Sequence, residues 1–194
     1  MAGARSPVKP RERVLDAAQE LFHARGIDAV GVDVISDVSG VSKSTLYRHF
    51  PSKADLVAAY LQRHHERRFD EWVAALGDPS DTPRARLLGL FDWLEEWFNS
   101  TDFRGCRFLN SRAQLPDPRH PAHGIPQRHK EQIRTLLSEI AREGGARDAT
   151  ELGHELILLV DGAVMHAVLE GVPTPARRAK TLAGLALDAH GLAP

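Results

Sequence analysis

Residues 34–50 read VISDVSGVSKSTLYRHF, and this stretch decides the fold. It predicts two short helices, at about 33–39 and 43–49, separated by a tight turn. Gly40 lies in that turn, where a glycine takes the left-handed backbone at the lowest cost. The side chains expected to face inward from the first helix are Val34, Ile35 and Val38.

The second of these helices is too polar to lie in a core. Only Leu46 and Phe50 are clear apolar anchors, and Ser42 precedes the helix as its cap. A helix held by two anchors, with a polar outer face, suits insertion into the major groove of DNA. Lys53 adds positive charge beside the N-terminus of the next helix, which favours a phosphate contact.

The rest of the chain shows helical periodicity and no convincing strand pattern. One helix precedes the motif, at about 9–25, and a capping box formed by Ser52 and Asp55 opens the next helix after it. The later helices are expected at about 53–76, 83–98, 105–115, 121–143, 148–171 and 174–191. We therefore predict an all-α protein of about nine helices, with an N-terminal three-helix domain over 1–55 and a larger helical domain over 56–194.

The net charge does not suggest a nucleic-acid partner, but the distribution of charge along the chain is mildly asymmetric. The chain has 194 residues, 42% apolar and 26% charged, as in ordinary soluble globular proteins. Its net charge is −1, yet residues 1–68 carry 11 Lys and Arg against 8 Asp and Glu, whereas residues 69–194 carry 14 against 18. Positive charge is thus enriched in the part that contains the two-helix motif.

Other sequence signals bear on location. No strongly apolar stretch approaches the roughly 18 residues needed to span a membrane, so no membrane partner is expected. Residues 1–10 have a few basic side chains but no apolar core, which predicts a disordered arm rather than a secretory signal. A single cysteine, Cys106, excludes an intramolecular disulfide and fits the reducing cytoplasm.

Residues 26–56 resemble the DNA-binding domain of the TetR family of transcriptional repressors, in a match that extends over roughly the first 60 residues. The matching elements are the stripe Ala17-Ala18-x-x-Leu21-Phe22, Gly26, the turn Gly40-Val41-Ser42, Tyr47-x-His49-Phe50 and Lys53-x-x-Leu56. Each piece alone is weak, whereas the combination is specific. The chain departs from the family at Gly31, where a Thr or Ser is common, and at Ser36 and Ser39, which replace common alanines.

The resemblance implies a homodimeric regulator, usually a repressor, that binds double-stranded operator DNA through its helix-turn-helix. It also implies that residues 56–194 dimerise and bind an unidentified small-molecule effector, which releases the protein from DNA. The DNA-contacting positions carried over from the family are Ser42, Lys43, Ser44, Thr45, Tyr47, Arg48, His49 and Lys53.

Aromatic side chains of the larger domain form either plain core or the lining of an apolar cavity. The segment Gly105-Cys106-x-Phe108-x-Asn110 also resembles one that lines the effector cavity in some family members, so Asn110 or Arg112 is expected to orient a ligand. The residues assigned to this cavity are Phe69, Trp72, Trp93, Trp97, Cys106, Phe108, Asn110, Arg112 and His129.

The ten histidines match no metal-site signature, so no metal and no cofactor are expected. His64 and His65 are adjacent on a helix and point about 100° apart. No nucleophile or carboxylate flanks His49, so no catalytic residue is assigned and an enzyme is not expected. Cys106 is interpreted as a buried, inert thiol, with a redox sensor as the alternative.

The last two helices, at about 148–171 and 175–190, are predicted to form a homodimer interface. Gly153 and Gly162 would allow close helix approach, and the alternative is that these helices only close the monomer. The apolar side chains assigned to the interface are Leu152, Leu156, Leu159, Val160, Ala163, Val164, Ala167, Leu182, Leu185, Ala186 and Ala189.

These patterns favour a cytoplasmic, ligand-responsive DNA-binding repressor. A transcriptional activator or a regulator that needs no ligand fits the same residues. A helical ligand carrier or enzyme, in which the helix-turn-helix is only structural, is the alternative from another class of protein.

Overall fold

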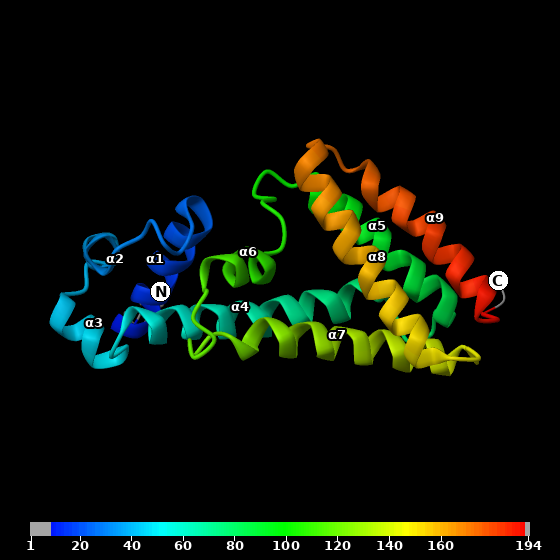
Figure 1. The fold of residues 1–194 in the computed structure, drawn as a ribbon, viewed down its shortest axis with the longest axis horizontal. Helices are drawn as coiled ribbons and strands as arrows, with labels where there is room; N and C mark the ends of the chain where they lie inside the picture. Colours follow the sequence, from blue (N-terminus) through cyan, green and yellow to red (C-terminus); the bar gives the residue numbers. More distant parts are fainter. Residues whose placement is uncertain (1–8, 193–194) are drawn as a thin grey trace, which may run out of the picture. The chain divides into compact units, whose positions relative to one another are not determined.

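A computed structural model describes residues 9–192, so the arm expected at 1–10 lies almost entirely outside the described residues. Within this range the chain forms nine α-helices and no strand, which confirms the predicted all-α fold (Figure 1). The helices are α1 (Pro10–Arg25), α2 (Val32–Ser39), α3 (Lys43–His49), α4 (Lys53–Ala75), α5 (Pro83–Phe98), α6 (Arg107–Gln114), α7 (Gly124–Glu143), α8 (Ala149–Glu170) and α9 (Thr174–Ala189).

The chain divides into two compact units, each built from two separate stretches of sequence. Unit 1 contains Met1–His64 and Arg107–Pro126, and unit 2 contains His65–Cys106 and Gln127–Pro194. The compact units therefore do not coincide with a single boundary near residue 55. In particular, α6 belongs to the same unit as α1, α2 and α3.

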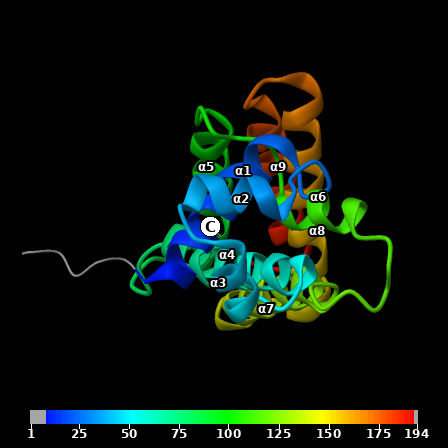
Figure 2. The same cartoon turned by 90° about the vertical axis from the view of Figure 1, so that its left-hand side faces the viewer.

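Unit 1 is organised around the apolar face of α1, and Figure 2 looks onto its first three helices. The predicted stripe is buried, and Phe22 meets the ring of Tyr60 on α4 edge-on, with 5.4 Å between ring centroids. Arg63 of α4 also pairs with Asp16 of α1, with 2.8 Å between Nη1 and Oδ1. These contacts hold the first half of α4 against α1.

Unit 2 has its core on one face of α5, α8 and α9. Figure 1 shows α8 and α9 side by side and running in opposite directions. Asp148 caps the N-terminus of α8, where its side chain accepts a hydrogen bond from the Glu151 amide at 3.0 Å. A Cβ atom at Gly153 would collide with Ser138 of α7, so this glycine allows α8 to approach α7 closely.

Helix α8 corrects the expectation that no stretch is long and apolar enough to cross a membrane. An 18-residue window of this helix has a mean hydropathy of 1.5. Charged residues are spread through the helix, so an uninterrupted apolar run is absent although the average is high. The core helices of soluble proteins meet the same criterion, and one face of α8 is part of the core of unit 2.

Candidate nucleic-acid interface and ligand site

The turn between α2 and α3 is closed by hydrogen bonds from glycine and serine. Gly40 takes the left-handed conformation, with φ 61°, and its amide donates to Asp37 O at 3.2 Å. The buried Ser36 Oγ donates to Val41 O at 2.6 Å, and the buried Ser39 Oγ accepts from the Val41 amide at 3.3 Å. The two serines that depart from the family pattern therefore fix the turn from inside.

The inward face predicted for α2 is only partly right. Ile35 is buried, Val34 is half-buried, and Val38 is 55% exposed. Ser36 and Ser39 are the residues that turn inward, because their hydroxyl groups find backbone partners in the turn. Val38 therefore belongs to the outer surface of the motif.

Helix α3 is held from beneath and polar outside, as predicted. Leu46 is 0% exposed and Phe50 is 3% exposed, whereas Thr45 is half-buried. Ser42 caps the helix by accepting from the Thr45 amide at 3.4 Å. The exposed side chains of the cap and the helix are Ser42, Lys43, Ser44, Tyr47, Arg48 and His49. A short helix that offers this many polar groups to solvent can contact phosphates and base edges.

Two of the expected DNA contacts already have partners within unit 1. The Lys43 amine lies 2.5 Å from the Asp33 carboxylate on α2, and this hydrogen bond and charge raise the pKa of Lys43 above its usual value. The half-buried Lys53 donates from Nζ to the carbonyl oxygen of Ile27 at 2.7 Å. Lys43 therefore keeps its charge, and both lysine amines are already engaged by groups of the protein.

Two arginines of α1 lie beside the helix-turn-helix, and the sequence analysis did not include them among the candidate site residues. A Cβ atom at Gly40 would lie only 2.6 Å from Arg13 Nη2, so this guanidinium lies directly against the turn. The Arg11 guanidinium carbon lies 5.4 Å from the centroid of the Phe50 ring. Their positions on the first turn of α1, ahead of the apolar stripe, were the available signal. Gly31, by contrast, precedes α2 with no side-chain cap.

The predicted ligand residues of unit 2 include a layered aromatic cluster. Trp93 and Trp97 stack with 6.0 Å between centroids, and the buried Trp72 meets Trp93 edge-on at 5.7 Å. The Arg68 guanidinium carbon lies 4.5 Å and 3.9 Å from the Trp93 and Trp97 centroids, a cation–π arrangement. Arg68 also donates to Glu71 at 2.6 Å. This cluster combines apolar surface with one partly buried charge pair.

His129 belongs to a histidine pair in the same unit. Its Nδ1 atom lies 3.0 Å from Nδ1 of His65, and the His129 ring is 3% exposed. Burial, reinforced by the neighbouring His65 charge, lowers the pKa of His129 to about 3. Burial also lowers the pKa of His65. Over residues 9–192 no group of three or more His, Cys, Asp and Glu side chains is placed to hold a metal ion.

The remaining predicted ligand residues are distributed over both units. Phe108, Asn110 and Arg112 are on α6 in unit 1, where the Phe108 ring lies 5.1 Å from His64 and Arg112 contacts His123. Cys106 is a half-buried free thiol in unit 2. Among the predicted ligand residues, the structure therefore joins Trp72, Trp93 and Trp97 into one cluster, which is part of the set.

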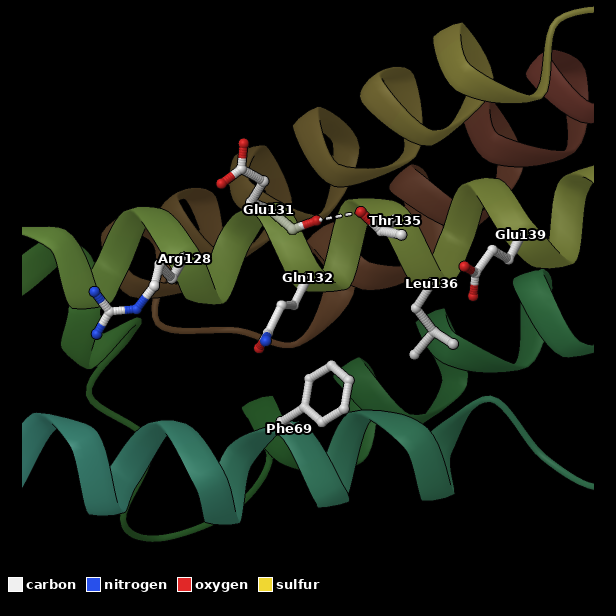
Figure 3. A pocket seen from close by; sticks show the side chains of 7 residues that line it. All are labelled: Phe69, Arg128, Glu131, Gln132, Thr135, Leu136 and Glu139. Atoms are coloured by element: carbon white, nitrogen blue, oxygen red, sulfur yellow. Dashed lines mark hydrogen bonds between the residues drawn. The ribbon is translucent and has the colours of Figure 1, made fainter.

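An open groove of about 420 Å³ runs between α4 and α7 in unit 2. In Figure 3, Phe69 points from α4 toward Gln132 and Leu136 of α7, and Arg128 lies at one end of the groove and Glu139 at the other. Phe69 is the predicted ligand residue that lines it. The groove offers an apolar floor with charges of opposite sign at its ends.

The face of α8 assigned to the dimer interface lies instead in the core of unit 2. This core contains Leu152, Leu156, Val160, Ala163, Val164 and Ala167, and Leu159 packs against it. A second apolar face of α8 is exposed, with Leu158 at 73% and Leu169 at 74%. On α9, Leu182 and Leu185 are 52% and 61% exposed, as an interface requires, whereas Ala186 packs against the core.

A groove of about 270 Å³ lies between α8 and α9, over Gly162.

Comparisons with known proteins agree with this geometry. A family model described as "Bacterial regulatory proteins, tetR family" matches residues 14–60. The repressor KstR2 of Mycolicibacterium smegmatis is 33% identical over 146 residues, which cover 72% of this chain and 67% of KstR2. The chain belongs to the TetR family. It is therefore a DNA-binding transcriptional regulator, and the predicted resemblance is confirmed.

Two further relatives extend the comparison. The crystal structure of SCO4454, a TetR-family regulator from Streptomyces coelicolor, has a TM-score of 0.84 and 31% identity, covering 93% of this chain and 95% of that one. The activator FasR of Mycolicibacterium smegmatis is 37% identical over 111 residues, which cover 56% of this chain but only 48% of FasR. Relatives of this TetR-family chain thus include a repressor and an activator.

Proposed function

We propose that this TetR-family protein is a homodimeric, cytoplasmic repressor that leaves its operator when a small hydrophobic effector binds. The observation that carries the proposal is helix α3. Its polar side chains face solvent, while Leu46 and Phe50 fix it to the rest of unit 1. A helix presented in this way, with Arg13 of α1 against the preceding turn and Arg11 over the Phe50 ring, is suited to the major groove.

The proposed DNA contacts follow from exposure and chemistry. Near the N-terminus of α3, Ser44 and Thr45 reach base edges, while Tyr47, Arg48 and His49 contact phosphates. Ser42 and Lys43 begin the helix, and Lys53 contributes charge beside the N-terminus of α4. Helix α3 is called the reading helix. Two copies related by two-fold symmetry would place their reading helices about 34–36 Å apart, in successive major grooves.

The proposed dimer uses the exposed face of α8 in place of the face first assigned, and keeps Leu182 and Leu185 of α9. Leu158, Leu169, Leu182 and Leu185 are each more than half exposed. These four side chains lie on two adjacent helices, whereas the exposed leucines of a monomer are usually scattered singly. A second copy of the same face would cover them.

The proposed effector binds in unit 2. Trp72, Trp93 and Trp97 provide apolar aromatic surface, and Arg68 with Glu71 provides polarity within it. A weakly polar, hydrophobic molecule matches this chemistry. Binding would shift the population of dimers toward a spacing that no longer fits the operator.

An activator remains the second candidate, because FasR carries that name and aligns with 56% of this chain. A repressor and an activator can present the same reading helix, so α3 does not distinguish them. Transcription from the regulated promoter, measured with and without the protein, separates them by the sign of the change.

The test of DNA binding is a fluorescence anisotropy titration with the DNA upstream of the protein's own gene, at several salt concentrations. We expect nanomolar affinity that falls steeply with salt. Arg48→Ala should weaken binding about tenfold, whereas Arg142→Ala, which removes an exposed charge from α7 of unit 2, should leave it unchanged. Undiminished affinity in a Lys43→Ala, Arg48→Ala double variant would refute the contacts, and no affinity at low salt would favour the ligand carrier.

A further inference from the structure

The turn between α1 and α2 is held by side chains from outside the three-helix motif. The turn begins at Gly26, with φ 81°, and continues through the buried Ile27 and the exposed Asp28. The amide of Gly26 still donates to Phe22 O at 3.0 Å as the last bond of α1. Beyond it, the amides of Ile27 and Asp28 point away from any helix ladder and need other acceptors.

Gln114, the last residue of α6, supplies that acceptor. Its Oε1 atom accepts from the Ile27 amide at 2.7 Å and from the Asp28 amide at 3.4 Å. Its Nε2 atom donates to Asn110 O at 3.2 Å, so the amide group has an oxygen toward the donors and a nitrogen toward an acceptor. A Cβ atom at position 26 would lie 3.0 Å from Oε1, so a glycine there leaves room for this contact.

Lys53 completes the arrangement from α4. Its Nζ atom donates to Ile27 O at 2.7 Å, so both backbone polar groups of Ile27 are satisfied by side chains. One side chain is 26 residues away in sequence and the other is 87 residues away. The same short turn is thus fixed by α4 and by α6 at once.

The position of α2 depends on this turn. Helix α2 starts at Val32, only a few residues after Ile27, and among its eight residues only Ile35, Ser36 and Ser39 are buried. So short a helix with so few core contacts is oriented largely by the segments that flank it. Its other flank is the α2–α3 turn, so α2 carries the constraint onward to the reading helix.

We infer that Gln114 is a positioning residue for DNA reading: its amide holds the α1–α2 turn and thereby sets the orientation of α2 and α3. The inference rests on the proposed function of α3. It assigns to α6 a role in operator affinity, although α6 follows the three-helix motif by more than 50 residues. Gln114 itself touches no DNA in this account.

The test compares two substitutions of similar size. Gln114→Met keeps the length of the side chain and removes the acceptor, whereas Gln114→Glu keeps an oxygen acceptor for both amides. Gln127→Met, on the exposed surface of α7, controls for the exchange of glutamine for methionine. Each variant is titrated with the upstream DNA and with unrelated DNA of equal length, and amide hydrogen exchange of Ile27 and Asp28 is followed by NMR.

We expect Gln114→Met to weaken binding to the upstream DNA by roughly 5- to 30-fold, since a buried amide that loses its acceptor loosens the turn. Exchange at Ile27 and Asp28 should accelerate, and binding to unrelated DNA and the salt dependence should stay unchanged because no phosphate contact is lost. Gln127→Met should behave like the wild type in affinity and in exchange. Gln114→Glu keeps the acceptor but loses the donor to Asn110 O and adds a negative charge, so it should keep slow exchange at Ile27 and Asp28 and should weaken binding to both DNAs equally.

The inference is overturned if Gln114→Met speeds exchange but binds the upstream DNA like the wild type. It is also overturned if Gln114→Glu, with exchange still slow, loses as much affinity for the upstream DNA relative to unrelated DNA as Gln114→Met does. It is also overturned if exchange at the two amides does not change. A wild-type protein that binds no DNA would refute the proposed function instead, and the exchange data would still report whether Gln114 holds the turn.

Discussion

The exposed leucines of α8 allow a quantitative test of the proposed dimer. Leu169→Ala removes three carbon atoms, worth about 2.4 kcal/mol if the side chain is fully buried. Scaled by the 74% of Leu169 that a partner could cover, this is about 1.8 kcal/mol per copy. A two-fold interface contains the residue twice, so the dimer loses about 3.5 kcal/mol, which is roughly a 300-fold rise in the dissociation constant.

Sedimentation velocity over a concentration series measures that constant directly. Leu109→Ala, at a leucine of α6 that is 48% exposed and belongs to no proposed interface, is the matched control and should dimerise like the wild type. Leu158→Ala should weaken the dimer to a similar extent as Leu169→Ala. A dissociation constant that stays the same in both α8 variants would show that this face does not form the interface.

Three further predictions concern charge, turn geometry and pH. Asp33→Asn frees the Lys43 amine, so DNA binding should tighten at low salt and its dependence on log salt should steepen by up to about 0.9, as measured by anisotropy titrations. Gly40→Ala places a side chain at φ 61°, at a cost of about 1–2 kcal/mol, and should lower the melting temperature by about 2–8 °C in circular dichroism. His129, whose pKa falls from 6.5 to about 3 on folding, stays neutral in the native state while the unfolded chain takes up a proton. Its contribution to stability is therefore complete above pH 6.5 and decreases by up to about 1.4 kcal/mol per pH unit as the pH falls toward 3. Urea unfolding at pH 7.5 and 5.5 should show a smaller loss in His129→Gln than in the wild type, whereas the exposed His154→Gln should match the wild type.

Local chemistry made most of the reading motif predictable. Gly40, the Ser42 cap and the anchors Leu46 and Phe50 act within a few residues of one another, and the structure places each as expected. The capping box of Ser52 and Asp55 is also present, with 2.6 Å between Ser52 Oγ and Asp55 Oδ2. Such features depend on backbone geometry that the neighbouring residues impose.

The spacing of apolar residues did not predict which face of a helix is buried when two of its faces are apolar. In α8, Leu156 and Val160 lie in the core while Leu158 and Leu169 are exposed, and both sets recur at helical spacing. The choice between the faces depends on which one α5, α7 and α9 cover, and that information is not local. In α2, the hydroxyl groups of Ser36 and Ser39 bond backbone atoms of the adjacent turn and displace Val38 from the interior, which the spacing of apolar residues does not reveal.

The candidate ligand residues were the least predictable part. The aromatic cluster around Trp93 joins side chains of α4 and α5, and periodicity does not reveal that Arg68 stacks on its rings. Gln114 gave no signal at all, because its partners precede it by 86 and 87 residues and a glutamine at a helix end has many neutral interpretations.

The return of the chain to unit 1 at Arg107–Pro126 affects how this protein can be divided or recombined. A fragment that stops at His64, or a chimaera that exchanges only the residues before it, carries the α1–α2 turn without the α6 side chain that its amides bind. A DNA-binding unit that can be transferred to another protein would have to contain both stretches of sequence. Exchange of operator specificity between relatives should accordingly succeed more often when the α6 segment is transferred together with the helix-turn-helix.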